Sequence, residues 1–235
     1  MYHSATKFLS GHGVVIGGVL VDGGRFDWER SGKFATLTAP YAGFHGMVFS
    51  EESTTAAFLL RARREGVRDF GACMAPFTAF QILQGIETLP LRMARHVENT
   101  RRIVAFLDAH PVVQSVAYPE LSRHPDHALA QRLLPKGCGA VFSFSIRAGT
   151  DGAAGARERG RRFIETLTLF SHLANVGDAK SLVIHPASTT HFRVSADALR
   201  AAGIDEGTVR LSIGLEDPDD LIEDLSRALH AAGKA

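Results

Sequence analysis

The order of apolar segments in the second half of the chain limits the folds open to it. From Val112 onward, short runs rich in β-branched residues alternate with segments of helical periodicity. The predicted order is strand, helix, strand, helix, strand or loop, helix, strand, helix, over residues 112–118, 126–134, 140–146, 154–167, 169–176, 195–201, 209–213 and 218–232. We therefore expect a small α+β domain in this part of the chain.

The last of these helices has the clearest signals. Asp217 can cap it, Pro218 suits the first helical position, and acidic residues follow in the first turn, where they complement the helix dipole. One apolar stripe runs along it, made of Leu221, Ile222, Leu225 and Leu229. The stripe predicts that this helix packs against the domain core.

Two features organise the first half. The run Val14–Val21, closed by Asp22-Gly23-Gly24, predicts a buried strand that ends in a tight turn. A long helical pattern covers residues 76–108, but Pro90 interrupts it, which predicts two helices or one kinked helix. We place a domain boundary there, giving domains 1–89 and 90–235.

Composition narrows the classes of function. The formal net charge is +1, from 26 basic and 25 acidic residues, so no overall field attracts nucleic acid or anionic lipid. The arginine clusters at 61–68 and 157–162 lack interleaved aromatic residues and are typical of solvated helix faces. We therefore expect small molecules or other subunits as partners, and neither nucleic acid nor membrane.

The cysteines and histidines indicate neither a disulfide framework nor a metal site. Cys73 and Cys138 lie far apart with no CxxC spacing, which favours a cytoplasmic protein. His124 and His127 lack further ligands and fit a helix-entry turn better. No apolar run approaches the ~20 residues that span a bilayer, and the first residues do not form a signal-peptide pattern.

Lys7 is the residue with the most distinctive chemical context. It lies in Ser4-Ala5-Thr6-Lys7 and is followed by the glycine-rich Gly11-His12-Gly13. A lysine amine can form an imine with an aldehyde cofactor, and Ser4 and Thr6 share one side of an extended segment, where both hydroxyls can reach one phosphate. The short motif taken alone is explained as well by a solvated lysine in a mobile N-terminus.

Three longer segments strengthen the cofactor interpretation. They are residues 68–77 (RDFGACMAPF), 83–93 (LQGIETLPLRM) and 173–191 (LANVGDAKSLVIHPASTTH). Together with the Lys7 motif they resemble the cystathionine γ-synthase-like, pyridoxal-phosphate-dependent family of Cys/Met metabolism. Residues 30–70 and the Asn175-Val176-Gly177-Asp178 run resemble most its O-acetylhomoserine sulfhydrylase branch. The resemblance implies an α/β protein of fold type I, with the C-terminal part of the large cofactor domain and a complete small α+β domain.

The resemblance also assigns roles to individual residues. It implies that Lys7 carries pyridoxal 5'-phosphate and moves protons, and that Ser4 and Thr6 contact the phosphate. Arg210 matches the arginine that grips the substrate α-carboxylate, and Asn175 matches a position that helps to hold it. Strand alternation turns Arg210 away from its apolar neighbours, although a surface salt bridge to Glu216 or Asp217 explains an arginine there equally well.

The loop flanked by His185 and His191 corresponds to one that lies near the substrate pocket in the family, and we expect the two histidines to be pocket-wall residues rather than catalysts. The implied reaction is γ-replacement on O-acetyl-L-homoserine by sulfide or a thiol, giving homocysteine or methionine and acetate. Cystathionine γ-synthase and methionine γ-lyase would use the same residues, so the nucleophile stays open.

Family members carry a long N-terminal half before the lysine, and this sequence starts close to it. We therefore expect a C-terminal fragment that forms a homo-oligomer or associates with an N-terminal half. An incompetent remnant or an interaction module is the alternative to an enzyme.

Overall fold

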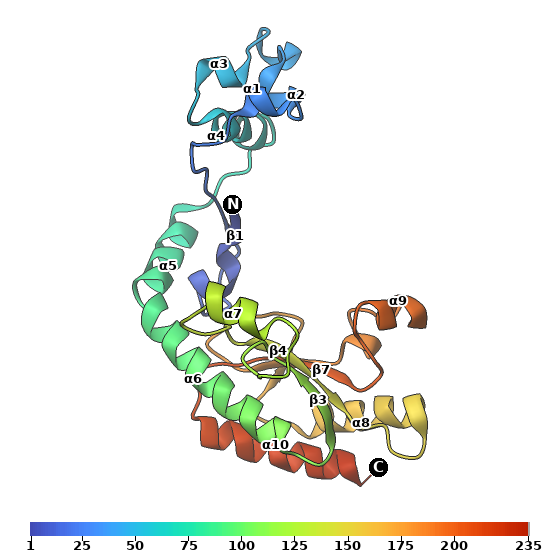
Figure 1. The fold of residues 1–235 in the computed structure, drawn as a ribbon. Coiled ribbons are helices and arrows are strands. Elements are labelled where there is room, and N and C mark those ends of the chain that lie inside the picture. The colour runs from blue at the N-terminus through green and yellow to red at the C-terminus, as the bar shows by residue number, and fades with distance from the viewer. Residues whose placement is uncertain (235) are drawn as a thin grey trace. The chain divides into compact units, whose positions relative to one another are not determined.

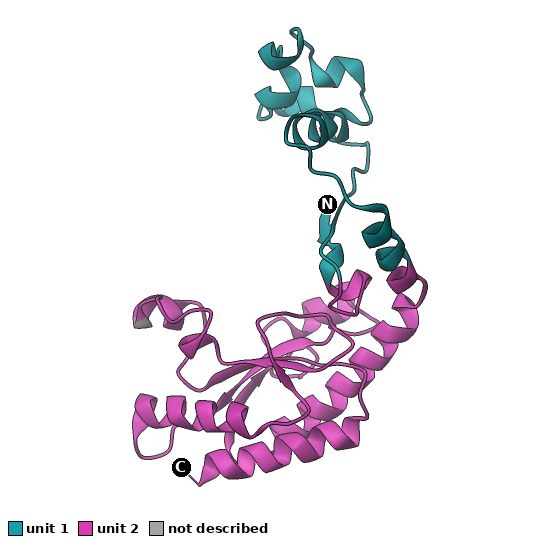
Figure 2. Cartoon of the chain, turned by 180° about the vertical axis from the view of Figure 1, so that it is seen from behind, with its two compact units in different colours: residues 1–6, 15–83 teal, residues 7–14, 84–235 magenta. Residues whose placement is uncertain are grey.

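The computed structural model describes residues 1–234, which divide into two compact units (Figures 1 and 2). Unit 1 comprises Met1–Thr6 and Val15–Leu83, and unit 2 comprises Lys7–Val14 and Gln84–Ala235. Helices and strands both occur, as expected for an α/β protein. The domain division after residue 89 stays a prediction.

Unit 1 contains a two-stranded antiparallel ribbon and a cluster of short helices. The ribbon pairs β1 (Tyr2–Ser4) with β2 (Gly18–Leu20). The helical cluster packs around the buried side chains of Leu37, Phe49 and Ala57. Its elements are α1 (Trp28–Ser31), α2 (Ala35–Thr38), η2 (Ala42–Phe44), α3 (Phe49–Glu52), α4 (Ala57–Ala62) and η3 (Arg63–Asp69).

The buried strand predicted over Val14–Val21 is wrong. Only Gly18–Leu20 is a strand, and all three residues are exposed. Ile16 is 87% exposed. Within the described chain β2 pairs with β1 alone, so the apolar run has neither a second strand neighbour nor a covering layer.

Unit 2 is built on a five-stranded sheet in the order β3-β4-β7-β6-β5. All neighbours are antiparallel except β5 and β6. The strands are β3 (Val113–Ala117), β4 (Val141–Ile146), β5 (Ser171–His172), β6 (Leu182–Ile184) and β7 (Thr208–Ser212). Four of them lie where the sequence predicted a strand, or a strand or loop, whereas β6 was not foreseen.

The helices of unit 2 follow the predicted order closely. Pro90 stands in the first turn of α6, so the long pattern is two helices, as one of the two expectations had it. The helices are α5 (Pro76–Glu87), which begins in unit 1, α6 (Leu89–Asp108), α7 (His127–Leu133), α8 (Gly152–Thr166), α9 (Ala196–Ala201) and α10 (Pro218–Gly233). In Figures 1 and 2, α6, α8 and α10 lie on one side of the sheet. Their apolar faces share one buried core with the strands.

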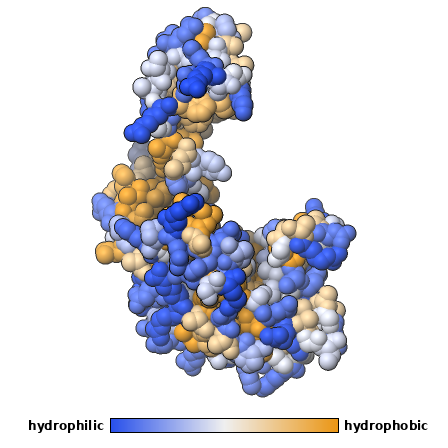
Figure 3. Space-filling model, in the orientation of Figure 1, coloured by the Kyte–Doolittle hydropathy of each residue, from blue (hydrophilic) through white to orange (hydrophobic). Residues whose placement is uncertain are grey.

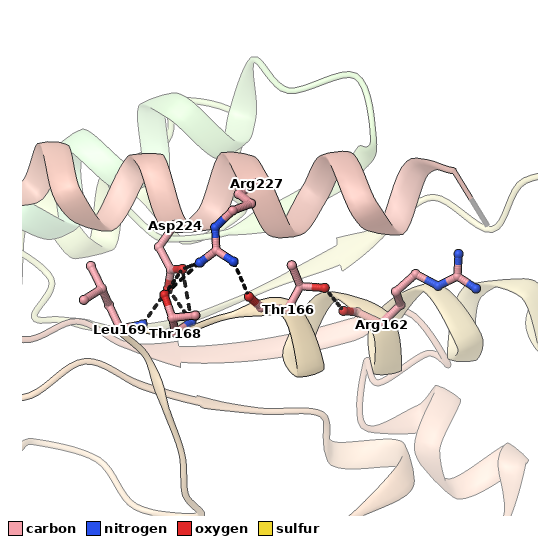
Figure 4. A network of polar contacts seen from close by, with 6 residues as sticks. All are labelled: Arg162, Thr166, Thr168, Leu169, Asp224 and Arg227. Atoms are coloured by element: carbon pink, nitrogen blue, oxygen red, sulfur yellow. Dashed lines mark hydrogen bonds and ion pairs between the residues drawn. The ribbon is translucent and has the colours of Figure 1, made fainter.

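The α10 helix begins as predicted and is tied to the end of α8. Asp217 accepts a hydrogen bond from the Asp219 amide, and Leu221, Leu225 and Leu229 are fully buried. Figure 4 shows a polar network in which the Asp224 carboxylate accepts hydrogen bonds from the backbone amides of Thr168 and Leu169 and from the Thr168 hydroxyl. This network closes the loop that leads from α8 into β5.

Exposed apolar side chains gather over α5 (Figure 3). Phe77, Phe80 and Leu83 are each more than half exposed, and Leu91 follows at the start of α6. Among residues 1–234, no helix combines the length and the apolar character needed to cross a membrane.

Candidate functional site

Lys7 lies within the short element η1 (Ala5–Leu9), where the backbone kinks at Lys7 itself (φ −88°, ψ −132°), and the residue is half-buried. Its carbonyl accepts a hydrogen bond from the Gly11 amide at 2.8 Å, which closes the loop into Gly11-His12-Gly13. Its Nζ donates a hydrogen bond to Asn175 Oδ1. Both residues belong to unit 2 although 168 positions separate them in the chain. The fold therefore brings together two of the residues singled out in the sequence.

Gly177 explains how the Asn175 loop approaches the lysine so closely. Its φ is +76°, and a Cβ added there would lie 2.8 Å from the Phe8 amide nitrogen and 3.1 Å from Lys7 Cβ. The Gly177 amide donates a 3.0 Å hydrogen bond to the Ser212 hydroxyl, which is buried. A glycine is needed here both for the left-handed backbone and for the close contact.

Arg210 is the middle residue of the central strand β7, between Ser143 of β4 and Ile184 of β6. Val209 and Leu211 are fully buried in the core, so the alternation predicted for Arg210 is confirmed. Its Nη2 donates to the Asn175 carbonyl at 3.4 Å. Lys7 and Arg210 thus both bind Asn175. Lys7 binds the side-chain amide of Asn175, and Arg210 binds its backbone carbonyl.

Glu216 and Asp217, the two residues considered for a surface salt bridge with Arg210, form other contacts. Glu216 accepts hydrogen bonds from the amide and the hydroxyl of Ser181, at 2.6 and 2.9 Å. Asp217 caps α10. Because both carboxylates are engaged elsewhere, the guanidinium keeps donors for a further acceptor.

Ser4 and Thr6, the expected phosphate contacts, belong to unit 1. Ser4 is exposed at the end of β1, opposite Gly18. The Thr6 hydroxyl accepts from the Gly17 amide at 3.0 Å and donates to the Gly17 carbonyl at 3.3 Å. These bonds hold the two chain segments of unit 1 together, and the phosphate role of both residues stays a prediction.

The pocket-wall role of His185 and His191 stays a prediction, and the structure shows what holds each ring. The side chain of His185 is buried, and both ring nitrogens are engaged, Nδ1 with the Ser188 hydroxyl at 2.8 Å and Nε2 with the Glu206 carbonyl at 2.7 Å. Burial lowers its pKa, so the ring is neutral near pH 7. His191 is half-buried and its Nδ1 lies 2.8 Å from the Thr190 hydroxyl.

The sequence interpretation missed a row of buried polar side chains on α6. Arg92, His96 and Asn99 are spaced four and three residues apart, which puts them on one face of the helix. All three are buried and donate to backbone carbonyls outside α6. The signal available in the sequence was this helical spacing of polar residues inside a stretch otherwise examined for its apolar residues.

A family model and individual relatives both place this chain among PLP-dependent enzymes of Cys/Met metabolism. The Cys/Met metabolism PLP-dependent enzyme family model matches residues 1–230. An O-acetyl-L-homoserine sulfhydrylase of Leptospira meyeri is 47% identical over an alignment of 236 positions, and the alignment covers 97% of this chain and 52% of that protein. The chain therefore spans about half the length of the curated relatives it matches.

Two solved structures resemble the chain over most of its length. A protein described as an O-acetylhomoserine (thiol)-lyase of Campylobacter jejuni, with N'-pyridoxyl-lysine-5'-monophosphate, has a TM-score of 0.84 at 36% identity and covers 97% of this chain and 53% of its own. A cystathionine γ-synthase of Xanthomonas oryzae pv. oryzae in complex with cystathionine has a TM-score of 0.72 at 33% identity, covering 99% and 50%. The expected fold type I is confirmed by these neighbours.

Proposed function

The chain belongs to the Cys/Met metabolism PLP-dependent enzyme family, and on this basis we propose that it forms the C-terminal half of an O-acetylhomoserine sulfhydrylase. The reaction is replacement of the γ-acetoxy group of O-acetyl-L-homoserine by sulfide or a thiol, with release of acetate and of homocysteine or methionine. The observation that carries the proposal is the convergence of Lys7 and Arg210 on Asn175.

The residues present fit pyridoxal 5'-phosphate in their chemistry. Lys7 offers a primary amine, and the acceptor that its Nζ contacts, Asn175 Oδ1, belongs to a neutral amide rather than a carboxylate. When bound, the cofactor supplies an aldehyde carbon for the amine and a ring that accepts the electrons released at the substrate Cα. When it is not bonded to that carbon, Lys7 Nζ would take the proton from the substrate Cα and return it, with Asn175 Oδ1 directing the amine.

Arg210 is proposed to bind the substrate α-carboxylate. A guanidinium presents paired donors in a plane, which match the two oxygens of a carboxylate. Its position in the middle of the sheet makes it rigid, because β4 and β6 hold the backbone on both sides. Asn175 completes the arrangement by orienting both the lysine and the arginine.

Two further parts of the proposal concern the whole enzyme. We propose that the cofactor site is completed by an N-terminal half, in the same polypeptide or a separate one, and that the assembled protein is a homo-oligomer in the cytoplasm. The exposed side chains of Ile16 on the β2 run and Phe77 on α5 support association, because large apolar groups of this kind are usually covered by a partner.

The experiment is complementation with the N-terminal half of the Leptospira meyeri relative, expressed separately or fused before Met1. We expect the assembly to bind PLP with the absorbance of a lysine-linked cofactor and to make homocysteine from O-acetyl-L-homoserine and sulfide. The chain alone should do neither. Lys7→Ala in the assembly should remove the absorbance and the turnover, and Lys180→Ala is the matched control that should leave both intact.

The same assay separates the alternatives. Cystathionine formed preferentially with cysteine as nucleophile would indicate a cystathionine γ-synthase, in line with the Xanthomonas oryzae neighbour. γ-Elimination from methionine would indicate a methionine γ-lyase. An assembly that binds no PLP, or that keeps the lysine-linked absorbance after Lys7→Ala, would contradict the proposed function and favour an incompetent remnant.

A further inference from the structure

The polar row on α6 holds two backbone segments in place. Arg92 Nη2 donates to the Gly85 carbonyl at 2.6 Å and to the Leu9 carbonyl at 3.4 Å. His96 Nδ1 donates to the Ile213 carbonyl at 2.7 Å. Asn99 Nδ2 donates to the carbonyls of Gly214 and Glu216, at 3.1 and 2.9 Å. One helix face therefore binds both the turn after Lys7 and the segment after β7.

These two segments carry the proposed functional residues. Leu9 is two residues after Lys7, and Ile213 is three residues after Arg210. His96 lies between them, because its ring also meets the ring of Phe8, the residue after Lys7, edge-on at 5.3 Å. In His96 a single side chain thus contacts the neighbour of the lysine and the end of the arginine strand.

We propose that His96 is a positioning residue that sets Lys7 against Asn175 and Arg210. The inference rests on the proposed roles of Lys7 and Arg210. Its hydrogen bond fixes Ile213 where β7 leaves the sheet, and its ring supports Phe8 from the same point. A shift of either segment would alter the Lys7–Asn175 contact, because Gly177 packs directly against Phe8 and is bound to Ser212.

The geometry identifies which nitrogen matters. A carbonyl only accepts, so Nδ1 carries the proton in the bond to Ile213. The Nε2 atom is buried and has no hydrogen-bond partner among the described residues. A side chain with a donor at the position of Nδ1 should therefore preserve the hydrogen bond to the Ile213 carbonyl. A side chain with its donor one bond further out, at the position of Nε2, should lose this bond.

Asn and Gln make this distinction. In His96→Asn the amide nitrogen can occupy the Nδ1 level, and in His96→Gln it is displaced towards the Nε2 level. His185 is the matched control, because it is buried in the same unit but bonds a carbonyl through Nε2. There the roles reverse, so that His185→Gln should keep the carbonyl bond and His185→Asn should lose it.

The measurement is competitive labelling of the lysine amines in the chain without cofactor, read by mass spectrometry. The five lysines are Lys7, Lys33, Lys136, Lys180 and Lys234, and the last four serve as internal references. In His96→Gln we expect Lys7 to be labelled about fivefold faster relative to the references, the factor expected when one net hydrogen bond is lost. His96→Asn should stay closer to the wild type, and neither His185 variant should change Lys7.

Hydrogen exchange on the same proteins checks that they are folded. In His96→Gln, faster exchange should be confined to residues 7–13 and 213–216. Unchanged Lys7 labelling in a folded His96→Gln protein would overturn the proposal, and so would an equal effect in His185→Asn. If His96→Gln does not fold, Phe8→Leu replaces it, and unchanged Lys7 labelling in that variant would also overturn the proposal. Because no cofactor is needed, failure here differs from failure of the proposed function, which is an assembly without lysine-linked absorbance.

Discussion

At the scale of single residues, Gly177 makes the sharpest prediction. Ala at 177 would strain a backbone at φ +76° and push a methyl group into Phe8 and Lys7. Gly203 is the matched control, because its φ is +71° and nothing lies within 4 Å of an added Cβ. Gly203→Ala should cost the left-handed backbone term of about 1–2 kcal/mol. Gly177→Ala should lower the free energy of unfolding by about 1–3 kcal/mol more, the cost of overpacking.

Urea unfolding of the two variants tests this difference. If Gly177→Ala is no less stable than Gly203→Ala, the loop that carries Asn175 can move without a loss of stability. The close contact of Gly177 with Phe8 and Lys7 would then not require a glycine. Lys7 labelling in the same proteins adds a second reading, since only the change at 177 should free the amine.

The residues also show what a sequence can predict about a site. The direction of Arg210 followed from alternation along a strand, which is a local property of the backbone. The contact between Lys7 and Asn175 could not be predicted in this way. It depends on the left-handed backbone of Gly177 and on its hydrogen bond to Ser212, which forms only once β7 has packed beside this loop. His96 was missed for a similar reason, since its partner Ile213 is 117 residues away.

At the scale of elements, the junction between α8 and α10 depends on Asp224. Burial by itself opposes the charge on this carboxylate, but hydrogen bonds from Leu169 and Thr168 outweigh it and lower the pKa. Asp224→Asn replaces an acceptor by an amide and should destabilise the protein by about 1.5–3 kcal/mol, the range for hydrogen bonds to a charged group. Thermal or urea unfolding measures the loss.

Asp197 of α9 is the control for this element. It forms the same type of pair with an arginine three residues later, but its side chain is 90% exposed, against 2% for Asp224. Asp197→Asn should change stability by less than about 0.5 kcal/mol, as expected for a surface position. Equal effects of the two substitutions would mean that the network in Figure 4 is held by Arg227 and the backbone rather than by the buried carboxylate.

Elements were predicted best where one helix or strand carries its own signals. Asp217 and Pro218 marked the start of α10, and Pro90 marked the start of α6. The predicted buried strand over Val14–Val21 failed because burial depends on neighbours that a local pattern does not contain. The β6 strand was missed because its three residues, Leu182–Ile184, are too short for periodicity to identify.

At the scale of the whole molecule, three histidines of unit 2 link stability to pH. Burial lowers the pKa of His96, His110 and His185. Arg92, Glu216 and Asp178 face His96, and Glu206, Arg157 and Asp205 face His185, but their charges do not outweigh burial. A histidine in an unfolded chain has a pKa of about 6.5. Below that pH these three histidines therefore bind more protons in the unfolded chain than in the folded one.

The free energy of unfolding should therefore fall as the pH falls below about 6.5, by up to about 1.4 kcal/mol per pH unit for each of the three histidines. His185→Gln removes one titrating ring while a donor to the Glu206 carbonyl is kept, so urea unfolding between about pH 7.5 and about pH 5.5 should show a shallower slope. An equal slope in His185→Gln and the wild type would mean that the buried ring takes up its proton in the folded state, and that the interior of unit 2 admits the charge.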